Sequence, residues 1–321
     1  MICGVGGQDG AYLAQLLLTK GYHVIGTSRD ASVGRFENLR TLGVAERVEL
    51  VSMALNDFRS VLHCIKRHQP DEIYNLAGQT SVGLSFEQPV ETMESIAGGT
   101  LNLLEAIRFV DRPVRLYNAG SGECFGDTGT LPANESTPFQ PRSPYAVAKS
   151  TAHWLVRNFR EAYGLYACTG VLFNHESPLR AERFVTQKIA RAAARIAAGH
   201  SQSLRLGNIA VERDWGWAPD YVDAMWRMLN AGQADDFVIA TGRSVTLEYF
   251  ARSVFAWFDL SWEGHVVIDD TLLRPTDILT SRADPQKAHR VLGWRHSMDV
   301  DGVIDALCRA AAQSVAGAPA T

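Results

Sequence analysis

The sequence lacks the features that would mark several large classes of protein. Only five of its 321 residues are cysteine, and they form no CxxC pair and no cysteine/histidine spacing typical of zinc ligands. A small, odd number of scattered thiols argues against a disulfide framework and against a structural metal, so we expect no metal site. Reduced cysteines are typical of a cytoplasmic protein.

Charge of one sign and long hydrophobic runs are also scarce. The formal net charge is −4, which gives no reason to expect nucleic acid or an anionic membrane surface as a partner. No apolar run approaches the roughly 20 residues that cross a bilayer, and we expect no signal peptide. Residues 317–321 are small, and we predict that they form a disordered tail.

What the sequence does contain is a regular alternation of strand-like and helical segments. The expected strands are 23–28, 47–53, 71–78, 114–120 and 166–173, and the expected helices are 11–21, 58–68, 100–109 and 143–164. Strands separated by helices at this spacing predict a doubly wound parallel α/β sheet.

The rhythm changes after Leu172. Helices are expected at 184–199, 221–232, 246–258 and 299–311, strands at 203–208 and 236–242, and a loop at 212–220. We predict a smaller mixed α/β lobe interleaved with the large domain. The large domain takes residues 1–171 and about 209–242, and the lobe takes about 172–208 and 243–316.

A glycine turn follows the short apolar start of the chain. Gly4, Gly7 and Gly10 have the GxxGxxG spacing, with Gln8 and Asp9 inside the turn. Glycine allows a tight turn and lets backbone N–H groups approach a pyrophosphate at a helix N-terminus. The spacing alone is a weak signal, but its place at the start of a strand–helix–strand unit predicts a dinucleotide site.

The end of the second strand bears on the choice of dinucleotide. Arg29 and Asp30 are adjacent there. An acid at this place suits the ribose of NAD, whereas a cation suits the 2′-phosphate of NADP. We predict NADP with Arg29 as the phosphate partner, and NAD or a merely exposed arginine are the alternatives.

Four residues carry candidate chemistry. Tyr145 and Lys149 are four residues apart, so they lie on one face of the helix at 143–164. An ammonium beside a phenol is expected to lower the pKa of the tyrosine toward that of a general base. Ser121 and Glu123 follow the strand at 114–120, where α/β proteins build their sites. Glu123 is either a catalytic base or a solvated loop acid.

These motifs resemble the extended short-chain dehydrogenase/reductase superfamily, whose Rossmann fold pairs a glycine turn with Ser/Thr, Tyr and Lys. Longer strings narrow the resemblance to the GDP-mannose 4,6-dehydratase family. They are "GGQDGAYLAQLLLTKGY", "TPFQPRSPYAVAK", "FREAYGLYAC", "LFNHESPLR", "RDWG", "DYVDAMW" and "DFVIATG".

The resemblance implies an NADP-dependent lyase that acts on a GDP-sugar, most simply GDP-mannose. Tyr145 is then the base for the C4 hydroxyl, Ser121 its hydrogen-bond partner, Glu123 the base for the C5 proton, and Lys149 the support of Tyr145 and the nicotinamide ribose. A GDP-4-keto-6-deoxymannose reductase, another nucleotide-sugar dehydrogenase and a non-catalytic NADP-binding relative stay open as alternatives. The resemblance also implies a homodimer or homotetramer.

The resemblance further implies two sets of binding residues. On the cofactor side, besides the glycine turn, Arg29 and the Tyr145–Lys149 pair, these are Leu55, Leu76, Ala77, Gln79, Leu172 and His175. On the substrate side, besides Glu123, these are Ser81, Asn174, Lys188, Leu206, Gly207, Arg213, Arg274 and Asp277. His175 is alternatively a satisfied core histidine, and each cation is alternatively a solvated one.

Several positions depart from the family pattern. Gly122 stands where these dehydratases usually have serine, Gln187 where they usually have arginine, and Ala54 where an acid often contacts the adenine. Without a hydroxyl at 122, protonation of the departing water falls to Glu123. The departures leave the sugar open, and a heptose or another hexose is an alternative to mannose.

Overall fold

The computed structural model describes residues 1–110 and 112–316. Its main element is a seven-stranded sheet in the order β10-β6-β5-β4-β1-β2-β3, in which every neighbouring pair is parallel. The strands are β1 (Ile2–Cys3), β2 (Ile25–Ser28), β3 (Glu49–Ser52), β4 (Glu72–Asn75), β5 (Arg115–Ala119), β6 (Ala167–Leu172) and β10 (Phe237–Ile239). The predicted doubly wound sheet is confirmed.

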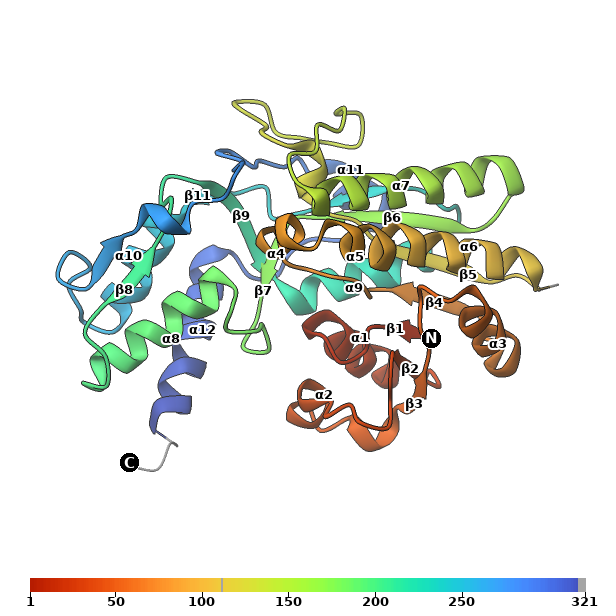
Figure 1. Cartoon of the computed structure of the whole chain (residues 1–321), viewed down its shortest axis with the longest axis horizontal. Coiled ribbons are helices and arrows are strands. Elements are labelled where there is room, and N and C mark those ends of the chain that lie inside the picture. The colour runs from red at the N-terminus through yellow and green to blue at the C-terminus, as the bar shows by residue number, and fades with distance from the viewer. Residues whose placement is uncertain (111, 317–321) are drawn as a thin grey trace.

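Helices cover both faces of this sheet (Figure 1). One face packs on α1 (Gln8–Thr19) and α9 (Ala218–Leu229), with α2 (Glu37–Thr41) beside α1 and α11 (Gln286–Leu292) beside α9. The other face packs on α3 (Phe58–His68), α6 (Gly99–Phe109) and α7 (Pro144–Tyr163). The short helices α4 (Val82–Glu87) and α5 (Pro89–Met93) lie against α7, and a π-helical turn at Glu94–Gly98 joins α5 to α6.

The smaller lobe has its own hydrophobic core, formed mainly by three helices. These are α8 (Val185–Ala197), α10 (Leu247–Trp257) and α12 (Val300–Ala316). Its strands are β7 (Asn174–Glu176), β8 (Leu204–Leu206), β9 (Glu212–Trp217), β11 (Ser244–Thr246) and β12 (Val266–Ile268). They form a three-stranded sheet, β11-β9-β7, and a two-stranded one, β12-β8.

The structure corrects one prediction and leaves two untested. Residues 212–220 were expected to form a loop but contain β9 and the first turn of α9. The polar residues of this segment suggested an exposed loop, but they lie in a buried strand. Asp214 is fully buried and accepts hydrogen bonds from Thr241 and Gly242. The domain boundaries stay a prediction, and the proposed tail, 317–321, lies outside the described residues.

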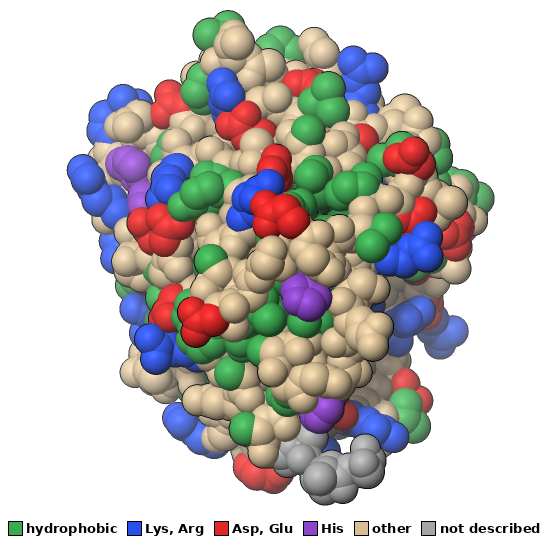
Figure 2. All heavy atoms as spheres, turned by 90° about the vertical axis from the view of Figure 1, so that its left-hand side faces the viewer, with side chains coloured by type: hydrophobic (Ala, Val, Ile, Leu, Met, Phe, Trp, Pro, Cys, Tyr) green, Lys and Arg blue, Asp and Glu red, His purple; other side chains and the backbone are tan. Residues whose placement is uncertain are grey.

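Some features of the described residues bear on partners. No helix there has the length and apolar character needed to cross a membrane. All five cysteines are free and buried. On the face of the smaller lobe in Figure 2, cationic and anionic side chains are intermixed, with apolar side chains between them.

Candidate active site

A cleft of about 440 Å³ lies at the carboxyl ends of the central strands, where the smaller lobe meets the large domain. Both parts of the chain contribute to its walls. It is lined by these sequence-predicted residues: Asp9, Leu76, Ser81, Ser121, Glu123, Tyr145, Lys149, Leu172, Asn174, His175, Lys188, Leu206, Gly207, Arg213, Arg274 and Asp277. The structure therefore brings all four candidate catalytic residues into one cavity.

Ser121 and Glu123 reach the cleft from a short 3-10 helix, Gly122–Phe125, that follows β5. Ser121 caps this helix, because its hydroxyl accepts a hydrogen bond from the Glu123 N–H at 3.3 Å. Burial raises the pKa of the Glu123 carboxyl, while Arg213 and Arg274 act in the opposite direction. Glu123 is therefore a stronger base than a solvated glutamate.

Tyr145 and Lys149 project from the first turns of α7. Ser143 caps the helix by accepting the Ala146 N–H at 3.1 Å, and Pro144 occupies its first position. Lys149 Nζ lies 5.8 Å from the centre of the Tyr145 ring and donates to Ala119 O at 2.7 Å. The helix cap and this hydrogen bond anchor the pair beside the end of β5.

Burial is the main influence on the pKa values of Tyr145 and Lys149. Burial lowers the pKa of Lys149 to about 8, and burial also raises the pKa of Tyr145. The nearby Glu123 and Cys124 raise the pKa of Tyr145 further, while the Ser121 hydroxyl lowers it. That Lys149 lowers the pKa of Tyr145 toward that of a general base stays a prediction, and burial is the effect that the ammonium has to overcome.

The glycine turn is built for close backbone approach. Gly4 has φ +82° and lies against the backbone of Ala77. A Cβ at Gly10 would lie 2.5 Å from Gly4 O, so no larger residue fits there. Gly7 precedes α1 and Gln8 begins it, so the turn presents the N-terminus of a long helix.

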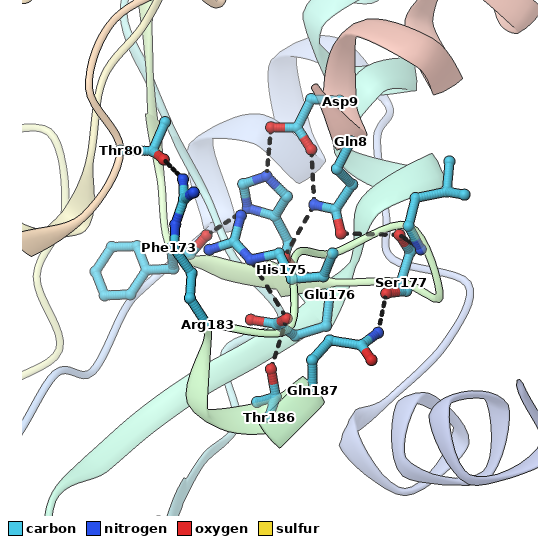
Figure 3. Close-up of polar contacts among 12 residues, drawn as sticks. Gln8, Asp9, Thr80, Phe173, His175, Glu176, Ser177, Arg183, Thr186 and Gln187 are labelled. Carbon is cyan, nitrogen blue, oxygen red and sulfur yellow. Dashed lines mark hydrogen bonds and ion pairs between the residues drawn. The ribbon is translucent and has the colours of Figure 1, made fainter. Parts of the chain in front are cut away.

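His175 is held on both ring nitrogens (Figure 3). Nδ1 lies 2.8 Å from Phe173 O and Nε2 lies 2.9 Å from Asp9 Oδ2, which requires a protonated ring for both contacts to be donated hydrogen bonds. Burial lowers the pKa of His175, but Asp9 more than offsets it and the net pKa is raised. The same ion pair, against burial, lowers the pKa of Asp9 to about 2.

Four other predicted cofactor residues are not part of the cleft lining. Ala77 and Gln79 follow β4, and Leu55 follows β3. Arg29 is exposed just after β2, next to Asp30, which accepts hydrogen bonds from Ser32. These residues lie at the ends of neighbouring strands, in the direction in which a dinucleotide would extend from the glycine turn.

The predicted substrate cations come from the smaller lobe and its loops. Arg213 is buried in β9, and its Nη2 lies 3.5 Å from Asp277 Oδ1. Arg274 Nη1 lies 3.9 Å from the same oxygen. Lys188 projects from α8, and its Nζ donates to Arg205 O at 2.7 Å.

The GDP-mannose 4,6 dehydratase family model matches residues 1–307. The chain belongs to this family. It is 45% identical to GDP-mannose 4,6 dehydratase 1 of Arabidopsis thaliana, over 95% of this chain and 87% of the relative. It is 42% identical to GDP-mannose 4,6-dehydratase of Sinorhizobium fredii, over 94% of this chain and 92% of the relative.

Solved structures share the fold of this dehydratase-family chain. RMD from Pseudomonas aeruginosa complexed with NADPH has a TM-score of 0.80 at 24% identity and covers 98% of both chains. DesIV, a dTDP-glucose 4,6-dehydratase from Streptomyces venezuelae with NAD bound, has a TM-score of 0.85 at 22% identity, covering 98% of this chain and 96% of that one. At these identities the likeness concerns the fold.

Sequence reasoning missed several polar residues in the cleft of this family member. Thr80, Glu176, Arg180 and Arg183 also line it. Arg180 Nε lies 3.5 Å from Glu176 Oε2, and Thr186 donates to that carboxylate at 2.7 Å. Position was the available signal, since Arg180 and Arg183 lie two and five residues after Pro178, close to the predicted contacts Asn174 and His175.

Proposed function

We propose that this protein is a nucleotide-sugar 4,6-dehydratase, a lyase that converts GDP-mannose to GDP-4-keto-6-deoxymannose with NADP. The observation that carries the proposal is the convergence of Ser121, Glu123, Tyr145 and Lys149 in one cleft. Membership of the GDP-mannose 4,6-dehydratase family supports the reaction and the GDP-sugar.

The residues present fit a bound NADP. Gly4 and Gly10 form a cradle that a Cβ would fill, at the N-terminus of α1. Arg29 is exposed after β2, where a cation suits a 2′-phosphate, and Tyr145 and Lys149 would face the nicotinamide end. When bound, the cofactor would accept a hydride from C4 of the sugar and return it to C6.

Tyr145 and Ser121 would act on the C4 hydroxyl. Tyr145 takes the proton of this hydroxyl as C4 becomes a ketone, while Ser121 donates a hydrogen bond to the oxygen. Because burial raises the pKa of Tyr145, the phenolate that accepts this proton would need the neighbouring Lys149 ammonium for its stabilisation. Lys149 positions the tyrosine from the next turn of the helix.

Glu123 would carry out the elimination. The C4 ketone acidifies the C5 proton, which moves to the Glu123 carboxylate as the C5–C6 double bond forms and hydroxide leaves C6. Gly122 has no hydroxyl, so we assign the proton that turns this hydroxide into water to Glu123. Glu123 then takes a proton from solvent and delivers it to C5 after C6 is reduced, and Tyr145 releases the C4 hydroxyl proton to solvent. A raised pKa suits both roles, because the carboxylate is a better base and retains the proton for delivery.

The test is incubation with GDP-mannose and NADP⁺ in D₂O, followed by mass analysis. We expect a product lighter by one water that carries solvent deuterium at C5. Glu123→Gln should cut turnover by about 10²–10⁴-fold and keep GDP binding. Glu161→Gln, an exposed site on α7, is the matched control and should behave as wild type.

Full turnover by Glu123→Gln would contradict the elimination step. A protein that leaves GDP-mannose unchanged but oxidises NADPH with a 4-keto sugar would be the reductase alternative. NADP binding without conversion of any nucleotide sugar would identify a non-catalytic relative. Parallel reactions with NAD⁺ test the cofactor preference.

We also propose that the enzyme works in the cytoplasm as a homodimer or homotetramer. Free, buried cysteines support a reducing compartment. Phe109 of α6, and Trp154 and Tyr163 of α7, are large apolar side chains that stay exposed, as expected of a face that meets another subunit. Light scattering of the purified protein measures the oligomer.

A further inference from the structure

The charged residues of the cleft are not balanced. Six lysine and arginine side chains line it, but only four carboxylates do. The six cations are Lys149, Arg180, Arg183, Lys188, Arg213 and Arg274. An excess of cations in a cavity favours an anionic ligand, and the arginines provide the donor pairs that match phosphate oxygens.

Most of these cations already have a protein partner that fixes them. Arg180 is paired with Glu176, and Arg213 and Arg274 share Asp277. Lys149 and Lys188 each donate to a backbone carbonyl. Within residues 1–110 and 112–316, no carboxylate lies within ion-pair distance of Arg183, so this arginine differs from the other three.

Arg183 instead connects two walls of the cleft. It lies in the segment between β7 and α8, and its Nη2 donates to Thr80 Oγ1 at 3.2 Å, on the loop after β4 (Figure 3). This hydrogen bond joins the smaller lobe to the large domain. Both residues are exposed, and a neutral hydroxyl uses only one of the five N–H donors of a guanidinium.

The neighbouring Gln187 does not supply a cation to the cleft. It is buried, donates to Ser177 O at 2.8 Å, and is absent from the cleft lining. Arg183, two residues before α8, therefore offers the cleft a guanidinium with no carboxylate partner among the described residues. Its other described contact is with the ring of Phe184, 5.1 Å away.

We propose that Arg183 is a substrate-binding residue that exchanges its hydrogen bond to Thr80 for charge-assisted hydrogen bonds to the diphosphate of the GDP-sugar. Bonds from a guanidinium to phosphate are stronger than a bond to a neutral hydroxyl, so the exchange is favourable once the diphosphate enters. The inference rests on the proposed function for the identity of the sugar nucleotide. The cofactor also contains a diphosphate, and the experiment separates the two sources.

The experiment measures calorimetric affinities of wild type, Arg183→Ala, Arg183→Lys and Thr80→Val for GDP, guanosine and NADP⁺. Arg183→Ala should weaken GDP binding by about 10- to 100-fold and leave guanosine and NADP⁺ within about twofold. Arg183→Lys, which keeps the charge but not the paired donors, should fall between. Arg195→Ala, a half-buried site on α8 outside the cleft, is the matched control and should match wild type.

Thr80→Val separates a substrate contact from a structural link. If Arg183 changes partners, removing the hydroxyl leaves GDP affinity equal or slightly tighter. If Arg183 only holds the two lobes together, Thr80→Val and Arg183→Ala weaken GDP equally, and the proposal is overturned. Loss of NADP⁺ affinity in place of GDP affinity also overturns it, as does unchanged GDP binding by both Arg183 variants.

These readouts do not require turnover. A wild-type protein that fails to convert GDP-mannose but loses GDP affinity in Arg183→Ala would sink the proposed function and leave the role of Arg183 standing. With an active wild type, the Arg183→Ala variant should raise the KM for GDP-mannose by at least about tenfold. Its kcat should change by less than about threefold, because Arg183 contacts no reacting atom.

Discussion

Replacing Gly122 with serine should destabilise the protein and slow its turnover. A Cβ at this position would lie 3.0 Å from two carbons of the Phe173 ring. Phe173 is 2% exposed, and its other neighbour is Phe125, with ring centroids 6.2 Å apart and planes at 28°. The new side chain must therefore displace a packed aromatic pair or shift the turn that carries Glu123.

The size of the effect follows from two opposing contributions. Overpacking a well-filled site costs about 1–3 kcal/mol. Removing a glycine stabilises by about 0.4–1 kcal/mol, because the unfolded chain loses freedom. We expect a net loss of about 1–2 kcal/mol, which lowers the melting temperature of a chain of this length by about 1.5–3 °C. A shift of Glu123 by a few tenths of an ångström should lower kcat by about tenfold.

The assay combines thermal unfolding with initial rates for Gly122→Ser and Gly122→Ala. Both variants add the same Cβ, so the ratio of their kcat values isolates the hydroxyl, and we expect a ratio near one because Glu123 handles the proton. Gly232→Ala is the control, since nothing lies within 4 Å of the added Cβ. Phe173→Leu in the Gly122→Ser background should recover part of the loss, as a double-mutant cycle would show.

Two results would refute this reasoning. Wild-type stability in Gly122→Ala would mean that the aromatic pair yields without cost. A Gly122→Ser enzyme faster than both wild type and Gly122→Ala would mean that the elimination lacks a proton donor, and that Glu123 does not serve as one.

Two further predictions concern charge. Arg213→Met removes a cation that lowers the pKa of Glu123, so the acidic limb of the kcat profile should move to higher pH, and an unmoved limb would exclude the contact. Asp9→Asn should cost about 2–4 kcal/mol of unfolding free energy near pH 5–6. The Asp9–His175 ion pair of the wild type stabilises the protein most in this pH range. The lowered pKa of Asp9 contributes stability above about pH 4, and the raised pKa of His175 contributes stability below about pH 6.5. The His175 contribution disappears as the pH rises through the pKa of His175 in the folded protein. Denaturant titrations at pH 5.5 and at pH 9 should show a smaller difference between variant and wild type at pH 9, and an equal difference would contradict the ion-pair account.

The large domain was readable from sequence because its determinants are local. The central strands β4, β5 and β6 are short and mostly buried, and the helices that cover the sheet each show one apolar face. The helix α7 also has clear end signals, since Ser143 and Pro144 begin it and Gly164, with φ +67°, ends it. The candidate catalytic residues could therefore be located as well. Tyr145 and Lys149 lie in the first turns of α7, and Ser121 and Glu123 come directly after β5.

The strands of the smaller lobe were harder to predict from sequence, because residues distant in the sequence stabilise its polar segments. β9 contains Arg213 and Asp214, which would be costly to bury alone. The residues that pair with them, Asp277 and residues 241–242, are distant in the sequence. No local sequence pattern therefore predicts a strand here. Arg183 was missed for the same reason, because its contact with Thr80 spans 103 residues.

The origin of each group suggests how chemistry and recognition are divided in this fold. Ser121, Tyr145 and Lys149 belong to the ends of the sheet and to α7, and local caps and the Ala119 carbonyl hold them. The candidate phosphate-binding arginines come from the smaller lobe and its loops. Substitutions in the lobe should therefore act first on KM, and those at the sheet edge on kcat. Glu123 belongs to both groups, because it follows β5 and its pKa is lowered by Arg213 of the smaller lobe. Binding of the diphosphate near Arg213 would therefore alter the pKa of Glu123 and its strength as a base.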